Sequence, residues 1–304
     1  MRKVIVGVLL AVCLAAFIYG ITRNTKNEAH QYSSGGKVGV IYLEGPIVGG
    51  RGSGGLWGDP VGTDALIRHI RKAREDSDVK AVVLRMNTPG GSAAASQEVA
   101  AEIERLQKAG KVVVTSMGDV AASGGYWIAA GTDRIVANPA TTTGSIGVIW
   151  SVTNMQELFR KVGVAQDTIK SGPYKDIGSP ARPMTPEEKA LLQGMIDDIY
   201  GQFVAVVAKG RKMDEQKVRS LADGRIYTGR QAKELGLVDE LGDMYDAISM
   251  AAEMAGLNKE HPVIKEYGRT SPLERLLGDQ RTGTQLGKLN WSAVLPEILP
   301  DIIY

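Results

Sequence analysis

The stretch Gly118–Gly131, GDVAASGGYWIAAG, contains one serine, Ser123, with small residues on both sides. Glycine and alanine at these positions allow another backbone to approach the hydroxyl group closely. A serine hydroxyl is also the nucleophile of many acyl-transfer enzymes, provided that a base removes its proton. The stretch is therefore compatible with close packing of the backbone or with a nucleophilic site, and the rest of the sequence distinguishes the two.

A second glycine-rich stretch, Asn87–Ser92 (NTPGGS), lies between a strand pattern and a helix pattern. Pro89 restricts one backbone dihedral, while Gly90 and Gly91 can adopt positive φ, so that backbone N–H groups can point outward at the start of a helix. Such groups bind anions or stabilise an oxyanion. Taken alone, the stretch is more typical of a tight turn between a strand and a helix than of such a site.

The pattern of the chain predicts an α/β fold in which these two stretches meet. Strands alternating with helices imply right-handed crossovers and a largely parallel sheet. Both turns then lie at the carboxyl edge of the sheet, and neighbouring strands would bring the amides of Gly90, Gly91 and Gly124 to the hydroxyl of Ser123. The expected strands are 37–47, 79–87, 111–117 and 134–139, and the expected helices are 63–76, 92–109, 118–131, 185–209, 214–221 and 243–255.

A serine nucleophile needs a base, and the sequence favours a lysine. The histidines, His30, His69 and His261, fall outside the turns expected near the serine, which disfavours a Ser-His-Asp triad. A lysine must lose about 3 units from a pKa of about 10.4 to act as a base near neutral pH, and this requires burial. Lys175 in SGPYKDIGSP lies in an irregular stretch rather than on an amphipathic helix. Its neighbour Asp176 would raise the pKa of the lysine unless the carboxylate points away.

Five stretches carry a specific resemblance: NTPGG, MGDVAASGGYWIA, ATTTGSIGV, SGPYKDIGSPARPMT and DGRIYTGRQAKELGLVDELG. Together they resemble the bacterial signal peptide peptidase A (protease IV) family in its short, single-repeat form, over roughly residues 37–256. The resemblance implies a Clp-protease/crotonase-like fold with repeated strand-helix units. It also implies a Ser–Lys dyad of Ser123 and Lys175, with Ser145 helping to orient the lysine.

The same resemblance implies the rest of the site and the assembly. The oxyanion donors would be the amide of Gly124 and that of Gly91 or Gly90. Members of the family form homo-oligomeric rings, and in the short forms neighbouring subunits supply the serine and the lysine. The expected function is therefore a membrane-bound serine endopeptidase that degrades cleaved signal peptides after protein export, with peptides as substrates and no cofactor or metal.

The N-terminus has the composition of a membrane anchor. Val4–Thr22 contains 19 residues without a charge, enough to cross a bilayer of about 30 Å as a helix. No A-x-A-like exit follows Tyr19, which favours an uncleaved anchor over a signal peptide. Arg2 and Lys3 favour a cytoplasmic N-terminus, and hence a catalytic domain on the extracytoplasmic side of the bacterial cytoplasmic membrane. The predicted organisation is an anchor (1–22), a polar linker (23–36), a peptidase domain (37–260) and a C-terminal extension (261–304).

Composition excludes several other classes. The balance of 36 basic and 34 acidic residues, without a long basic run, disfavours a nucleic-acid partner. A single cysteine, Cys13, and scattered histidines exclude a disulfide framework and disfavour a zinc site. Residues 50–55 match G-x-G-x-x-G but do not open directly into a helix, which favours a flexible loop over a dinucleotide site.

Two alternatives remain open from the sequence. A crotonase-type acyl-CoA enzyme could use the same fold and oxyanion hole, because a fold does not fix a function. A non-catalytic membrane scaffold would result if Ser123 and Lys175 were merely packed. Turnover of an acyl-CoA and labelling by a serine-directed probe distinguish these alternatives from a peptidase.

Overall fold

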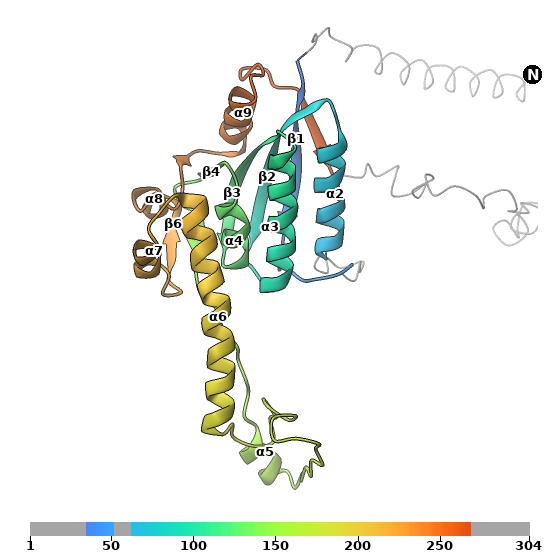
Figure 1. Cartoon of the computed structure of the whole chain (residues 1–304), viewed down its shortest axis with the longest axis vertical. Coiled ribbons are helices and arrows are strands. Elements are labelled where there is room, and N and C mark those ends of the chain that lie inside the picture. The colour runs from blue at the N-terminus through green and yellow to red at the C-terminus, as the bar shows by residue number, and fades with distance from the viewer. Residues whose placement is uncertain (1–34, 52–61, 269–304) are drawn as a thin grey trace, which may run out of the picture. The chain divides into compact units, whose positions relative to one another are not determined.

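The computed structural model describes residues 35–51 and 62–268 (Figure 1). The predicted anchor at residues 1–22 and nearly all of the predicted C-terminal extension lie outside the described residues. Within the described part of the chain, no helix combines the length and the apolar character that a membrane crossing requires.

An eight-stranded, mostly parallel sheet forms the centre of the fold, which confirms the predicted α/β class. The strand order is β6-β5-β3-β2-β1-β8, and β4 pairs with the first part of β3 and with β7. The pairings given for this sheet are parallel except that of β5 with β6. The strands are β1 (Lys37–Glu44), β2 (Val79–Thr88), β3 (Val112–Ala122), β4 (Arg134–Ala137), β5 (Thr142–Gly144), β6 (Ile226–Thr228), β7 (Glu240–Leu241) and β8 (Ile264–Tyr267).

Helices cover both faces of the sheet (Figure 1). On one face, α2, α3, α4 and the C-terminal half of α6 pack into the larger apolar core. On the other face, α9 packs on β1, β2, β3 and β4. The helices are α2 (Thr63–Glu75), α3 (Ala93–Lys108), α4 (Gly124–Ala130), α5 (Gln156–Lys161), α6 (Pro186–Arg211), α7 (Glu215–Leu221), α8 (Gly229–Glu234) and α9 (Met244–Met254).

The strand before Ser123 is longer than predicted, and the helix after it is shorter. The predicted helix 118–131 begins only at Gly124, and β3 continues to Ala122. The reason is a partner that the pattern did not reveal: Val120–Ala122 pair in parallel with β5. This pairing satisfies backbone groups that would otherwise have required helical hydrogen bonds.

The 26-residue helix α6 begins where the sequence predicted. Thr185 accepts a hydrogen bond from the backbone of Glu188 in a capping box, and Pro186 occupies the first turn. The C-terminal half of α6 packs on α4, whereas its N-terminal half extends away from the sheet together with α5 (Figure 1). We call residues 148–195, which include α5 and the first part of α6, the arm.

The contact between α6 and α4 predicts a destabilising substitution. A Cβ atom on Gly210 would lie 1.8 Å from the carbonyl oxygen of Ala130, whereas a Cβ on Gly194 of the same helix would meet nothing within 4 Å. Gly210→Ala is therefore expected to lower the free energy of unfolding by about 1–3 kcal/mol through overpacking. Gly194→Ala, the matched control, is expected to raise it by up to about 1 kcal/mol through helix propensity.

Urea denaturation of both variants measures the two changes. Equal changes in the two variants would contradict the close contact between α4 and α6.

Candidate active site

Three strands end side by side at the carboxyl edge of the sheet. β2 pairs with β3, and the last part of β3 pairs with β5, all in parallel. Gly90 follows the end of β2 by two residues, while Ser123 and Ser145 directly follow β3 and β5. The amide of Ser123 donates a hydrogen bond of 2.9 Å to the carbonyl oxygen of Gly144. The predicted neighbourhood of β2 and β3 is therefore confirmed, and it brings these three residues to one edge.

Ser123 occupies a strained turn between β3 and α4. Its φ of 52° is uncommon for a residue with a side chain and costs on the order of 1–3 kcal/mol. Its carbonyl oxygen accepts the Trp127 amide at 2.9 Å, but its side chain makes no capping hydrogen bond. The half-buried hydroxyl group therefore has no hydrogen-bond partner within the described residues.

Glycines allow the turn after β2 to touch this serine. A Cβ on Gly90, whose φ is 98°, would lie 2.7 Å from both the Cβ of Ser123 and the amide nitrogen of Gly124. A Cβ on Gly124 would lie 3.3 Å from the amide nitrogen of Gly91. The turn after β2 and the turn after β3 thus approach each other more closely than residues with side chains would permit.

Two backbone amides beside the serine are free to bind an oxyanion. The amide of Gly90 donates to the hydroxyl of Thr88 at 3.1 Å. The amides of Gly91 and Gly124, by contrast, have no acceptor in the part of the chain that the structure describes. The sequence left open whether Gly90 or Gly91 supplies the second oxyanion donor. Because the amide of Gly90 is already hydrogen-bonded, the structure favours Gly91. A hydroxyl group beside two unpartnered N–H groups is an arrangement suited to acyl transfer.

Ser145 shares the unusual backbone of Ser123. Its φ is 51°, and its amide donates to the carbonyl oxygen of Arg225 at 2.8 Å. Among the described residues, Lys212 is the other non-glycine residue with positive φ, and it forms the left-handed C-cap of α6. Two of these three strained residues therefore flank the hydrogen bond between the ends of β3 and β5. Such strain is concentrated at functional sites in many proteins.

Lys175 does not lie in this cluster. It belongs to the segment between α5 and α6, and this segment lies at the end of α6 that extends away from the sheet (Figure 1). The length of α6 from Pro186 to Phe203, which packs against Trp127, is about 25 Å at the usual helical rise. The lysine side chain is exposed and has no hydrogen bond or ion pair within the described residues. The described residues of one chain therefore neither bury Lys175 nor bring it to Ser123.

Neither described histidine supplies an alternative base. His69 is half-buried in α2, and burial lowers the pKa of its imidazole. His261 is exposed near the end of the described residues. Neither side chain has a hydrogen bond to Ser123, so the described geometry contains no Ser-His pair.

Asp176 points away from Lys175, which removes the difficulty that the sequence raised. Its carboxylate binds the Lys170 ammonium at 2.6 Å and two nitrogen atoms of Arg182 at 2.8 and 2.9 Å. These two cations, Arg182 foremost, hold the pKa of Asp176 well below its usual range. Arg182 also pairs with the buried Glu188 and lowers the pKa of that carboxyl to about 2.

Lys170, Arg182 and Glu188 were not identified from the sequence as members of a charged cluster around Asp176. Lys170, Asp176, Arg182 and Glu188 follow one another at intervals of six residues, a spacing that does not place them on one face of a helix. Only the opposite charges in one short segment could have indicated the cluster.

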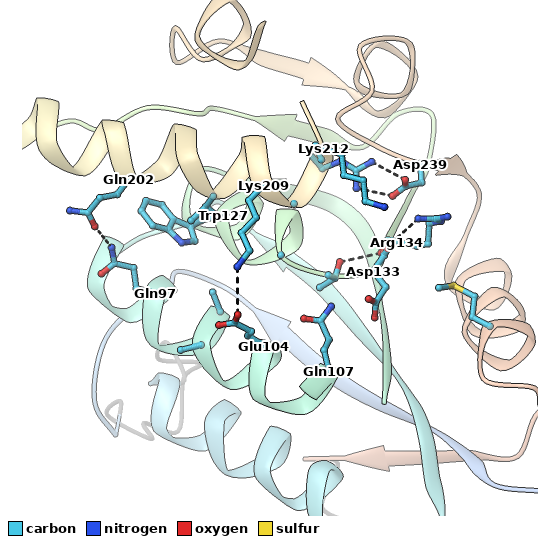
Figure 2. A pocket seen from close by; sticks show the side chains of 18 residues that line it. Gln97, Glu104, Gln107, Trp127, Asp133, Arg134, Gln202, Lys209, Lys212 and Asp239 are labelled. Carbon is cyan, nitrogen blue, oxygen red and sulfur yellow. Dashed lines mark hydrogen bonds and ion pairs between the residues drawn. The ribbon is translucent and has the colours of Figure 1, made fainter. Parts of the chain in front are cut away.

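A separate cavity lies between α3, α4 and α6 (Figure 2). Its volume is about 690 Å³, and Trp127 lies in its wall. Two polar pairs span it: Gln97 donates to Gln202 at 2.7 Å, and Lys209 approaches Glu104 at 3.5 Å. None of the predicted site residues lines this cavity. The carboxyl edge of the sheet, rather than this cavity, is therefore the candidate active site.

Comparison with known proteins identifies the family. Residues 105–258 match Peptidase family S49. The chain is 45% identical over 230 residues to a putative protease, slr0021, of Synechocystis sp., covering 75% of this chain and 83% of that protein. It is 40% identical over 231 residues to a putative signal peptide peptidase SppA of Enterococcus faecium, covering 76% and 67%. Protease 4 of Salmonella typhi is 39% identical over 270 residues, which are 89% of this chain and 42% of that protein.

The fold is also that of a solved structure, the membrane-bound stomatin-specific protease 1510-N. The TM-score is 0.53 at 15% sequence identity, covering 78% of this chain and 100% of that chain. The likeness shows that the two proteins share an α/β fold with a mostly parallel central sheet. The chain belongs to peptidase family S49 and is a serine protease of the signal peptide peptidase type.

The contact of Gly90 with the serine turn yields a prediction about activity. A methyl group on Gly90 would displace the amide of Gly124 and the Cβ of Ser123, and loss of one oxyanion donor costs about 10²–10³-fold in rate. Gly90→Ala is therefore expected to lower kcat/KM by about this factor. Gly110 has a similar positive φ of 82° but meets nothing within 4 Å, so Gly110→Ala controls for backbone strain alone.

Peptidase assays of both variants, with the circular dichroism spectrum as a check on folding, measure the difference. Equal losses of activity in Gly90→Ala and Gly110→Ala would contradict a role for the turn after β2 in the site.

Proposed function

We propose that this protein is a membrane-anchored serine endopeptidase that degrades signal peptides remaining after protein export, with Ser123 as its nucleophile. The observation that carries the proposal is that the hydroxyl of Ser123, and the amides of Gly91 and Gly124 beside it, have no hydrogen-bond partner among residues 35–51 and 62–268. Membership of a peptidase family favours this function over the acyl-CoA enzyme that the fold alone would allow. Small residues around the serine suit peptides with small apolar side chains, as in signal-peptide cores.

The reaction follows from these groups. Neutral Lys175 takes the proton of Ser123 as the Oγ atom bonds to the scissile carbonyl carbon. The amides of Gly91 and Gly124 donate hydrogen bonds to the resulting oxyanion. The lysine then returns the proton to the leaving amine as the C–N bond breaks, and water hydrolyses the ester by the same steps. Ser145, at the end of β5, orients the lysine.

The lysine comes from a neighbouring subunit of a homo-oligomeric ring in this proposal. The arm of one subunit reaches the serine of the next, which supplies the partner that a single chain lacks. Nine of the thirteen large apolar side chains that are exposed in the described residues belong to the arm. An exposed apolar surface of this kind is typical of a protein interface. The nine are Ile149, Trp150, Leu158, Val162, Val164, Ile169, Tyr174, Leu191 and Met195.

The location at the membrane rests on the uncharged segment Val4–Thr22 and on the basic residues before it. An anchor of this orientation places the peptidase on the extracytoplasmic side of the bacterial cytoplasmic membrane, where cleaved signal peptides remain in the bilayer. The matched solved protease is itself described as membrane-bound.

Labelling with a fluorophosphonate tests the dyad directly. The wild-type protein is expected to react, whereas Ser123→Ala and Lys175→Ala are expected to lose peptidase activity by on the order of 10⁴-fold and to lose labelling. Lys161→Ala removes another exposed lysine of the arm, on α5, and is expected to label normally. Undiminished labelling of Lys175→Ala would require another base, and an unlabelled wild-type assembly would favour the scaffold.

A mixing experiment tests whether neighbouring subunits share the site. Ser123→Ala and Lys175→Ala are each expected to be inactive. Their co-expression in equal amounts should restore about a quarter of the wild-type activity. The reason is that, with random mixing, one interface in four combines an intact serine with an intact lysine. Co-expression of Ser123→Ala with the double variant is the control and should stay inactive. Mixed assemblies that contain both single variants without activity would refute the shared site.

A further inference from the structure

The neighbouring residue Asp176 is an electrostatic obstacle to a lysine base. Adjacent Cα atoms are about 3.8 Å apart, so a free carboxylate at residue 176 could reach the ammonium of Lys175. A carboxylate within about 4–6 Å stabilises the charged lysine and raises its pKa. A general base must instead be neutral before it can accept the serine proton.

Arg182 and Lys170 occupy the carboxylate of Asp176. The Oδ1 atom accepts hydrogen bonds from the Lys170 Nζ at 2.6 Å and from one guanidinium nitrogen of Arg182 at 2.8 Å, and the Oδ2 atom accepts a second Arg182 nitrogen at 2.9 Å. The Asp176 side chain is 13% exposed. The side chain of Lys175 is exposed and has no polar partner among the described residues. The aspartate therefore interacts with these two cations rather than with the adjacent lysine.

The start of α6 holds Arg182 in place. Glu188 is 2% exposed, accepts hydrogen bonds from Arg182 and completes the capping box with Thr185. The charged groups that face Asp176 are thus Lys170 from the segment after α5, Arg182 from the segment before α6 and, through Arg182, Glu188 from α6. Their charges and that of Asp176 sum to zero, so the cluster as a whole adds no net charge beside Lys175.

We propose that Arg182 is a positioning residue for catalysis: it holds the Asp176 carboxylate away from Lys175, so that the lysine can lose its proton. This inference rests on the proposed role of Lys175 as the general base. The depressed pKa of Asp176 is consistent with it, because the same contacts that fix the carboxylate also keep it ionised.

The inference determines the direction of a change in the pH profile. Activity requires neutral Lys175 and therefore rises with pH through the pKa of the lysine. In Arg182→Gln, the freed carboxylate of Asp176 raises the pKa of Lys175. The rising limb of the plot of kcat/KM against pH is therefore expected to shift to higher pH by about one unit. Activity is expected to recover at higher pH, because the site itself remains intact.

Three further variants distinguish an effect of moving the Asp176 carboxylate from an effect of merely removing one positive charge. Arg182→Gln with Asp176→Asn lacks the interfering carboxylate and is expected to return the limb to its wild-type position. Lys170→Gln removes the same unit of charge but leaves Asp176 bound by Arg182, so a smaller shift is expected. Asp176→Asn alone is expected to leave the limb at or below its wild-type position.

The results have distinct meanings. An unmoved limb in Arg182→Gln would overturn the inference, as would equal shifts in Arg182→Gln and Lys170→Gln. An equal loss of activity at every pH that the double variant does not restore would mean that Arg182 only folds the arm, which also overturns it. Full activity of Lys175→Ala would instead refute the proposed base, independently of these profiles.

Discussion

The parallel register of β2, β3 and β5 is the constraint on which the site depends. Their ends deliver Gly90, Ser123 and Ser145 to one edge, although these residues are far apart in the chain. A slip of one residue in β3 would turn every side chain of that strand to the opposite face. It would also separate Gly90 from the serine turn, where a Cβ atom on Gly90 would lie 2.7 Å from both the Cβ of Ser123 and the amide nitrogen of Gly124.

Burial behind the serine maintains the strained turn. All seven residues of α4 are buried, and Tyr126 donates a hydrogen bond of 2.8 Å to the carbonyl oxygen of Leu237. Trp127 stacks on Phe203 of α6 with ring centroids 4.7 Å apart. A turn fixed on both sides by β5 and by this core can retain an unfavourable φ at Ser123, since relaxing it would disturb close-packed neighbours.

The sequence predicted the body of the fold better than the arm. Apolar runs and glycine turns were sufficient for the parallel sheet and for the cluster around Ser123, because both follow from local patterns and from parallel pairing. Strand β5 and the end of β3 were missed because three-residue strands carry too short a pattern to recognise. The contacts of Arg182 were missed because the segment between α5 and α6 has no regular period, and the projection of α6 beyond the sheet depends on tertiary packing.

The exposure of Lys175 links catalysis to assembly in the proposed mechanism. A solvated ammonium keeps its proton near neutral pH, and lowering its pKa by about 3 units corresponds to about 4 kcal/mol of lost solvation. No surface of the same chain supplies that desolvation among the described residues. The apolar side chains of the arm require a covering surface as well, so one association event would bury them and dehydrate the lysine together. In the same mechanism, Arg182 and Lys170 bind the carboxylate of Asp176. They thereby keep the adjacent negative charge from stabilising the protonated form of Lys175.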